Sequence, residues 1–211
     1  MTTPTSRRER KKAATHQALA DAALRLFLER GYDNVGVREI ADAADVSTTT
    51  LQKHFPSKES LVFDRDAAIE ETLVAAVRER APGTSVLAAL RDHTLARVER
   101  GVADSGGAEF MTLVRGTPAL TEYWHRMWMR HEDALTRALA AETGAPDADP
   151  ACAALAHFAL ETSALAMRSQ DPARTVEAAF AILEHGWRVS SRRDDDRQAH
   201  PPPARQAGSR S

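Results

Sequence analysis

Apolar side chains recur at spacings of three and four residues along most of this 211-residue sequence. Leu19, Ala23, Leu26 and Phe27 share one face of a helix, and a second such series runs through residues 120–139. No stretch alternates apolar and polar residues for long enough to favour a strand. The spacing therefore predicts an all-α fold.

Glycines, prolines and N-capping residues predict where these helices begin and end. Gly31 ends the first helix, and Pro56 interrupts the chain after the third. Ser47 and Ser57 are good N-caps. The predicted helices span residues 15–30, 37–44, 47–55, 57–80, 85–101, 118–143, 151–170 and 173–187, with a shorter helix inside 102–117.

Charge is unevenly distributed along the chain, although the whole sequence carries a net charge of only -2. The net charge is +2 over residues 1–60, -6 over 61–188 and +2 over 189–211. A basic arm ahead of an acidic body is typical of a two-part nucleic-acid-binding protein. A terminus that is charged only for solubility explains the same pattern. We expect a flexible basic arm over 1–14 and, because apolar residues are scarce there, a disordered tail over 189–211.

Composition also disfavours several kinds of site. The single Cys152 excludes a disulfide framework and multi-cysteine metal sites, and it fits a reducing cytoplasm. No apolar run reaches the ~20 residues that a membrane helix needs. His125 and His131 are six residues apart, which does not match the helical spacing of a shared metal ion. We expect a cytoplasmic protein with no metal, no cofactor and no membrane partner.

Residues 37–55 have the pattern of a helix-turn-helix. Ala41 is small where two helices would cross steeply, and Asp45 occupies a turn that favours left-handed backbone. The second helix then presents polar side chains that fit a major groove about 12 Å wide. Three packed helices with an ordinary polar surface are the alternative. The predicted inward face consists of Ile40, Ala44, Val46, Leu51 and Phe55.

Four runs at fixed spacing extend this pattern, over residues 26–32, 37–41, 44–47 and 51–61. The most diagnostic is His54-Phe55-x-Ser57-Lys58-Glu59-x-Leu61. In register and spacing these runs resemble the N-terminal domain of TetR-family transcriptional regulators. The resemblance implies an all-helical homodimer whose recognition helices enter successive major grooves of a palindromic operator in double-stranded DNA. It also implies a helix-turn-helix DNA-binding domain over 15–62 and a larger effector-binding and dimerisation domain over 63–188.

The DNA contacts follow from the motif, with three departures from the family's pattern. Val35 and Gly36 stand where the family usually has two threonines, Asp45 replaces the turn glycine, and Gln52 replaces a tyrosine. Gln52 is expected to pair with an adenine edge, and Lys58 to contact a phosphate at the start of the fourth helix. The candidate DNA contacts are Arg7, Arg8, Lys11, Lys12, Gly36, Val37, Arg38, Ser47, Thr48, Thr49, Thr50, Gln52, Lys53, His54 and Lys58.

The larger domain contains a segment rich in tryptophan and methionine over residues 123–131. Such side chains suit a pocket for an apolar ligand, with an ordinary domain core as the alternative. Residues 110–139 resemble TetR-family members that sense acyl-CoA-like ligands, which implies a small apolar effector, with an acyl-CoA-like molecule as a candidate. The candidate ligand contacts are Phe110, Met111, Trp124, Met127, Trp128 and Phe158.

The last two predicted helices are rich in alanine, which lets helices pack closely. This favours a four-helix dimer interface, with a pair buried inside one subunit as the alternative. The chain lacks a Gly-rich phosphate loop, His-Glu-x-x-His and Gly-x-Ser-x-Gly. We therefore expect a ligand-responsive repressor and not an enzyme. A helical enzyme or an adaptor that does not bind specific DNA is the alternative.

Overall fold

The computed structural model describes residues 6–103 and 107–186. Within these ranges the chain forms α-helices and one 3-10 helix but no strand, which confirms the predicted all-α class. The helices are α1 (Arg7–Arg30), α2 (Val37–Ala43), α3 (Thr48–His54), η1 (Glu59–Leu61), α4 (Asp66–Arg78), α5 (Val86–Ala103), α6 (Gly107–Gly116), α7 (Pro118–Thr143), α8 (Pro150–Ala166) and α9 (Pro172–His185).

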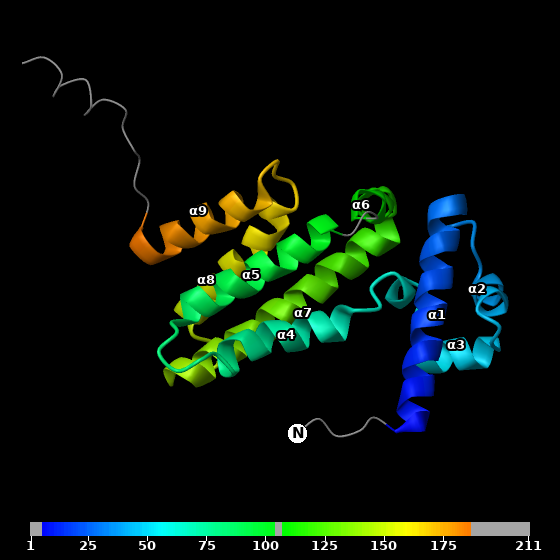
Figure 1. Cartoon of the computed structure of the whole chain (residues 1–211), viewed down its shortest axis with the longest axis horizontal. Coiled ribbons are helices and arrows are strands. Elements are labelled where there is room, and N and C mark those ends of the chain that lie inside the picture. Colours follow the sequence, from blue (N-terminus) through cyan, green and yellow to red (C-terminus); the bar gives the residue numbers. More distant parts are fainter. Residues whose placement is uncertain (1–5, 104–106, 187–211) are drawn as a thin grey trace, which may run out of the picture.

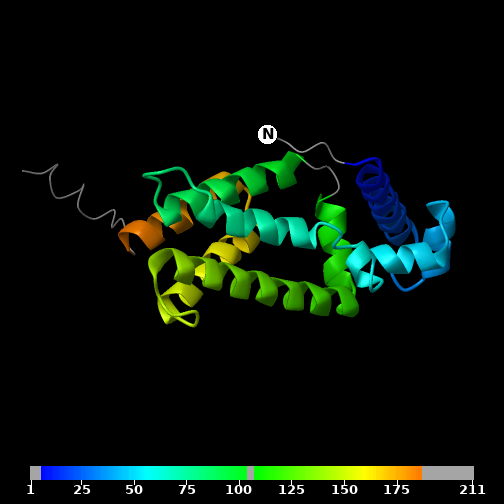
Figure 2. The same cartoon turned by 90° about the horizontal axis from the view of Figure 1, so that it is seen from below.

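The helices form a small head and a larger body, as Figures 1 and 2 show. The head consists of α1, α2, α3 and η1, and the body consists of α4 to α9. In the body, α7 packs against α4 and α8, while α5 packs against α9. The body contacts the head through α6, which touches α1, and through α7, which touches η1.

Helix α1 begins eight residues earlier than the sequence indicated. Ser6 Oγ accepts a hydrogen bond from Glu9 N at 3.2 Å, and Glu9 Oε2 accepts one from Ser6 N at 2.7 Å. This capping box satisfies two amide groups at the start of the helix and extends it to Arg7. The prediction of a flexible arm over 1–14 is therefore wrong for residues 7–14, which are helical. Residues 1–5 lie outside the described residues.

The predicted helix over 57–80 is split into η1 and α4. The Ser60 hydroxyl donates to Ser57 O at 2.6 Å, and Ser57 Oγ accepts from Ser60 N at 3.3 Å. Such local bonds compete with regular α-helical bonding and favour a short turn. The other helix ends agree with prediction within a few residues, except that α8 stops at Ala166. The predicted tail over 189–211 lies outside the described part of the chain.

A continuous apolar core joins the head to the body. Leu19, Phe27, Ile40 and Leu51 are buried in the head, and the buried residues 61–63 lead directly into the body core. Phe63 stacks on Tyr123 with ring centroids 5.2 Å apart. Residues 61–63, just before α4, therefore connect the core of the head with that of the body. None of the described helices is long and apolar enough to cross a membrane.

Candidate nucleic-acid interface

The turn between α2 and α3 has the geometry that a helix-turn-helix requires. Ala41 is completely buried, so α3 can approach α2 closely. Val46 N donates to Ala41 O at 3.0 Å, which closes the turn. Asp45 has a φ of 54°, the only positive value of a non-glycine residue in the described ranges. The expected left-handed residue at this position is confirmed.

Helix α3 presents polar side chains, four of which form no hydrogen bond within the described residues. Ser47 caps it, because Ser47 Oγ accepts from Thr50 N at 3.1 Å. The Thr50 hydroxyl lies 2.9 Å from the same oxygen and so is engaged within the turn. Thr49, Gln52 and Lys53 are exposed, and none of the three is hydrogen-bonded to the described residues. Thr48 is half-buried and likewise unbonded there, which leaves four side chains free for another molecule.

His54 differs from the outward position that the sequence indicated. Its ring lies 6.0 Å from the His16 ring on α1, and its Nδ1 is buried without a hydrogen-bond partner in the described chain. Burial lowers the pKa of His54, and the charges of His16 and Lys12 lower it further. His54 therefore packs between α3 and α1, because the early start of α1 places a helix against the end of α3.

The first turns of α1 carry the basic residues of the head. Arg7 and Lys11 are four residues apart, as are Arg8 and Lys12, so each pair shares a helix face. All four side chains are exposed, and none forms an ion pair within the described ranges. Lys12 lies near enough to His54 to affect its pKa. The positive end of α1 is thus next to the end of α3.

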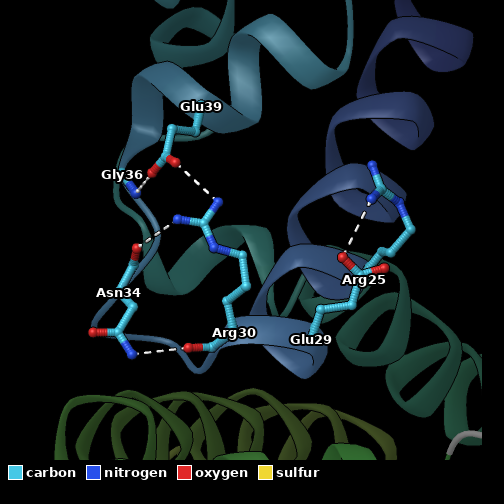
Figure 3. A network of polar contacts seen from close by, with 6 residues as sticks. All are labelled: Arg25, Glu29, Arg30, Asn34, Gly36 and Glu39. Atoms are coloured by element: carbon cyan, nitrogen blue, oxygen red, sulfur yellow. Dashed lines mark hydrogen bonds and ion pairs between the residues drawn. The ribbon is translucent and has the colours of Figure 1, made fainter.

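A polar network fixes the loop before α2, as shown in Figure 3. Glu39 Oε2 accepts from Gly36 N at 2.8 Å, and Glu39 Oε1 accepts from Arg30 Nη1 at 2.9 Å. Arg30 also donates to Asn34 O at 3.3 Å. The Gly36 amide, expected to meet a phosphate, is therefore already occupied by Glu39. Val37 and Arg38 follow it and are both exposed.

Lys58 is folded back onto the head. Its Nζ donates to Tyr32 O at 2.5 Å and lies 4.0 Å from the centroid of the Tyr32 ring. The Tyr32 hydroxyl donates to Glu59 Oε1 at 2.9 Å. Burial lowers the pKa of Lys58. The expected long helix with Lys58 at its start is wrong, because only the three-residue η1 follows; the side chain instead anchors the loop after α1.

Sequence reasoning missed the structural roles of Tyr32, Arg30 and Glu39. A usable signal was present for Glu39, because a glutamate three residues after Gly36 has capping-box spacing. No local pattern identified Tyr32, whose partners Lys58 and Glu59 lie 26 and 27 residues further along the chain.

The predicted ligand residues separate into three environments. Met111 and Trp124 line a cavity of about 160 Å³ between α6, α7 and α8. Met127 and Trp128 are buried, and Phe110 packs edge-on against Phe63. Phe158 is 52% exposed and lies outside this cavity. The structure therefore brings only two of the six predicted residues together around one space.

The last two helices carry an exposed apolar surface. Phe158, Leu165 and Ile182 are each more than 40% exposed. A shallow hollow of about 440 Å³ lies between α8 and α9, with Leu165, Ala178, Ala179 and Ile182 in its lining. Among the described residues, no group of histidine, cysteine, aspartate and glutamate is arranged to bind a metal ion.

Comparison with known proteins assigns the head. Residues 19–64 match the model of the family "Bacterial regulatory proteins, tetR family". The helix-turn-helix head is therefore similar to the DNA-binding domain of this family. A curated relative, the HTH-type transcriptional regulator TcmR of Streptomyces glaucescens, is 35% identical over 144 residues, which are 65% of this chain and 64% of TcmR. The chain thus spans slightly less than two thirds of that relative's length.

Two solved structures of transcriptional regulators have the same fold. Native NalD of Pseudomonas aeruginosa has a TM-score of 0.58 and 21% identity, covering 83% of this chain and 97% of NalD. FadR of Bacillus subtilis has a TM-score of 0.53 and 18% identity, covering 82% of this chain and 99% of FadR. At this identity the likeness establishes the two-part helical fold: a helix-turn-helix head followed by a helical body.

Proposed function

We propose that this chain is a ligand-responsive transcriptional regulator that acts as a homodimeric repressor on a palindromic operator. The observation that carries the proposal is the row of exposed, unbonded side chains on α3, held in place by the turn at Asp45. Thr49, Gln52 and Lys53 supply a hydroxyl, an amide and a cation, the groups that read base edges in a major groove. Such a regulator acts in the cytoplasm, where its DNA lies.

Phosphate contacts position the head on DNA. Lys12 lies beside the end of α3, since its charge affects the pKa of His54, and Arg7, Arg8 and Lys11 are exposed on the same turns of α1 without an ion pair in the described ranges. Arg38 adds another exposed cation at the start of α2. Basic side chains at such positions neutralise phosphates and make binding strongly dependent on salt. Lys58 can neutralise a phosphate in the same way only if its Nζ breaks the hydrogen bond to Tyr32 O.

Dimerisation through α8 and α9 accounts for the apolar surface there. Phe158, Leu165 and Ile182 would be unfavourable in water, and the alanines of α9 allow a second copy to pack closely. Two heads on one body then face two half-sites of a palindrome. A monomer at micromolar concentration in analytical ultracentrifugation would reject this part of the proposal.

The cavity beside Trp124 is the proposed effector site. The structure of FadR is described as a complex with stearoyl-CoA, and NalD is described as a repressor of a multidrug efflux pump. By analogy we propose a small apolar effector that binds the body and changes the separation of the heads. The effector releases DNA only if it binds the released form more tightly than the DNA-bound form.

A gel shift with the DNA upstream of the protein's own gene tests the proposal. We expect one retarded complex with the wild type and a loss of sequence preference for Thr49→Ala and Gln52→Ala. The control is Thr112→Ala, which changes an exposed threonine on α6 in the body. If specific and scrambled DNA bind equally, the chain is not a sequence-specific regulator, and the adaptor or enzyme alternative is favoured.

A salt titration of the same complex tests the basic face of α1. Replacing Arg7, Arg8, Lys11 and Lys12 by glutamine removes up to four cations that would neutralise phosphates. We expect weaker binding to all sequences, and the slope of log affinity against log salt to fall by about 0.9 for each phosphate that is no longer neutralised. An unchanged slope would exclude these residues from the interface.

A further inference from the structure

The cavity of about 160 Å³ between α6, α7 and α8 combines apolar and positively charged side chains. Its apolar lining consists of Met111, Val114, Trp124, Ala164 and Met167. Its charged lining consists of Arg115 and Arg168, and no acidic side chain is among the described residues that line it. A molecule in this space therefore meets apolar surface and two cations.

The apolar and charged residues lie at different depths. Val114 is 3% exposed, and Met111 and Trp124 are half-buried, so these three form the inner part of the cavity. Arg115 and Arg168 are exposed, so they lie at its opening. Apolar groups gain by leaving water, whereas a charged group is costly to bury. The cavity therefore suits a ligand with its apolar part inside and its charge at the opening.

Both arginines at the opening are available to an anion. Arg115 forms no hydrogen bond or ion pair within the described ranges. Arg168 Nε donates to Ala164 O at 3.2 Å, and no carboxylate of the described chain pairs with its guanidinium. The remaining polar side chain in the lining, Thr121, already donates to Val114 O at 2.9 Å. The two guanidinium groups therefore supply the donors that a ligand can use.

The volume of the cavity limits the size of the apolar part. An apolar cavity of about 150 Å³ holds one benzene-sized ring. The cavity beside Trp124 has nearly the same volume, so one ring or a compact branched group fills it. A long acyl chain contains far more carbon atoms than benzene and exceeds this space. The cavity therefore favours a compact apolar group over an extended chain.

Trp124 also connects the cavity to the head. Its ring centroid lies 5.8 Å from that of Phe63, which belongs to the residues that join the two cores. Phe110 on α6 packs against the same Phe63 ring at a centroid distance of 6.0 Å, and α6 touches α1. A ligand that displaces Trp124 or α6 therefore acts on residues that position the head.

We propose that the effector is a small aromatic carboxylate that binds in the cavity between α6, α7 and α8. Its ring lies against Trp124 and Met111, and its carboxylate binds Arg115 and Arg168. This inference rests on the proposed function, because it assumes that the body binds an effector, and it adds the chemical class of that effector. Bonds between guanidinium and carboxylate are charge-assisted, so they select the anion over a neutral molecule of the same shape.

The test compares benzoate, phenylacetate and 3-phenylpropanoate with their neutral amides on the full-length protein. Isothermal titration and tryptophan fluorescence measure binding. We expect the wild type to bind at least one carboxylate about tenfold or more tightly than its amide, the factor that one charge-assisted hydrogen bond provides. The double variant Arg115→Met with Arg168→Met should abolish this preference. Arg126→Met is the matched control, since Arg126 is an exposed arginine on α7 outside the cavity lining.

Ala164→Leu tests the space separately from the charge. The larger side chain occupies part of the cavity, so the carboxylate and the amide should both bind several-fold more weakly while both arginines remain. Thermal melting without ligand checks that each variant folds. The arginine variants change only exposed side chains, so they test the inference even if Ala164→Leu does not fold.

Three results would overturn the inference: equal binding of each carboxylate and its amide, binding of none of the probes, or an unchanged preference in the double arginine variant. The last result is expected if the two arginines only stabilise the ends of α6 and α8. The gel shift separates the two proposals. Wild-type protein that binds its operator but ignores all three carboxylates defeats this inference alone, whereas failure to bind specific DNA defeats the proposed function.

Discussion

Two cations, one in the head and one in the body, rest on aromatic rings but differ in what else surrounds them. Lys58 Nζ lies 4.0 Å from the Tyr32 ring centroid and also donates to Tyr32 O. Arg97 lies over Trp128 and has neither a hydrogen bond nor an acidic neighbour in the described chain. The Lys58 ammonium therefore has both a ring and a backbone acceptor as partners within the head. The Arg97 guanidinium has only the Trp128 ring as a partner among the described residues, and its nitrogens are not among the enclosed polar atoms that lack a hydrogen bond there.

The largest expected effect comes from removing the aromatic support of the head. Phe27 is completely buried, with its ring 5.0 Å from Tyr32 and 5.4 Å from Lys58 Nζ. Phe27→Ala should lower the free energy of unfolding by about 3–5 kcal/mol, because a cavity replaces a large packed ring. Urea denaturation of the wild type and the variant measures this loss of unfolding free energy.

The control for that variant is Phe158→Ala, which changes a ring that is 52% exposed on α8. At protein concentrations that keep the chain monomeric, it should change the unfolding free energy by less than about 0.5 kcal/mol. If the two alanine variants lose similar stability, the aromatic group around Tyr32 is not what holds the head together.

The comparison between the two cations is tested directly by one substitution at each. Lys58→Met loses the bond to Tyr32 O and the cation–ring interaction, so it should destabilise the protein by about 1–2 kcal/mol. Arg97→Met loses a cation–ring interaction but no hydrogen bond or ion pair within the described residues, so it should destabilise the protein by less than about 1 kcal/mol. Denaturant midpoints measured under identical conditions give both values. Equal losses in the two variants would refute the contrast.

The head was largely predictable from the sequence because its determinants are local. Small Ala41, left-handed Asp45 and the Ser47 cap act within a few residues of their own positions, and each was confirmed. The start of α1 was misplaced because the Ser6–Glu9 capping box was overlooked. The position of Lys58 was not predictable, since it depends on Tyr32, which lies 26 residues earlier.

The body was predictable only as a set of helices. The length of α7 followed from Pro118 and Gly144, which mark its ends. Which of its aromatic side chains face a cavity depends on how α6 and α8 pack against it, and helical periodicity does not encode that. Trp124 and Trp128 are one turn apart, yet only Trp124 lines the cavity. No sequence pattern marks Arg97, because the partners of its side chain within the described residues depend on how the helices pack.

A smaller effect is expected at Glu39, which forms both a helix cap and an ion pair in the head. Glu39 caps α2 through Gly36 N and also binds Arg30, and these contacts lower its pKa, the backbone bond most strongly. Glu39→Ala loses both contacts and should lower the melting temperature. Glu39→Gln keeps a capping oxygen and should lower the melting temperature less, since the ion pair is exposed. Thermal melts rank the variants; an equal loss for alanine and glutamine would assign the stabilisation to the ion pair.

The smallest expected effect is on the pH dependence of stability, where each part of the molecule contributes one histidine. Burial is the main cause of the lowered pKa of His54 in the head and of His93 in the body. Because the folded protein disfavours the charged form, acid protonates the unfolded chain first, and stability should fall as the pH drops below about 6.5.

Histidine-to-glutamine variants isolate the two contributions. His93→Gln and His54→Gln should each reduce the loss of melting temperature between pH 7.5 and 5.5 relative to the wild type. Asp64 acts in the opposite direction, because burial raises its pKa, but it is unchanged in both variants and cancels in the difference. His93 lies beside Arg97 and Arg100, whose charges oppose its protonation, whereas His54 faces His16 and Lys12.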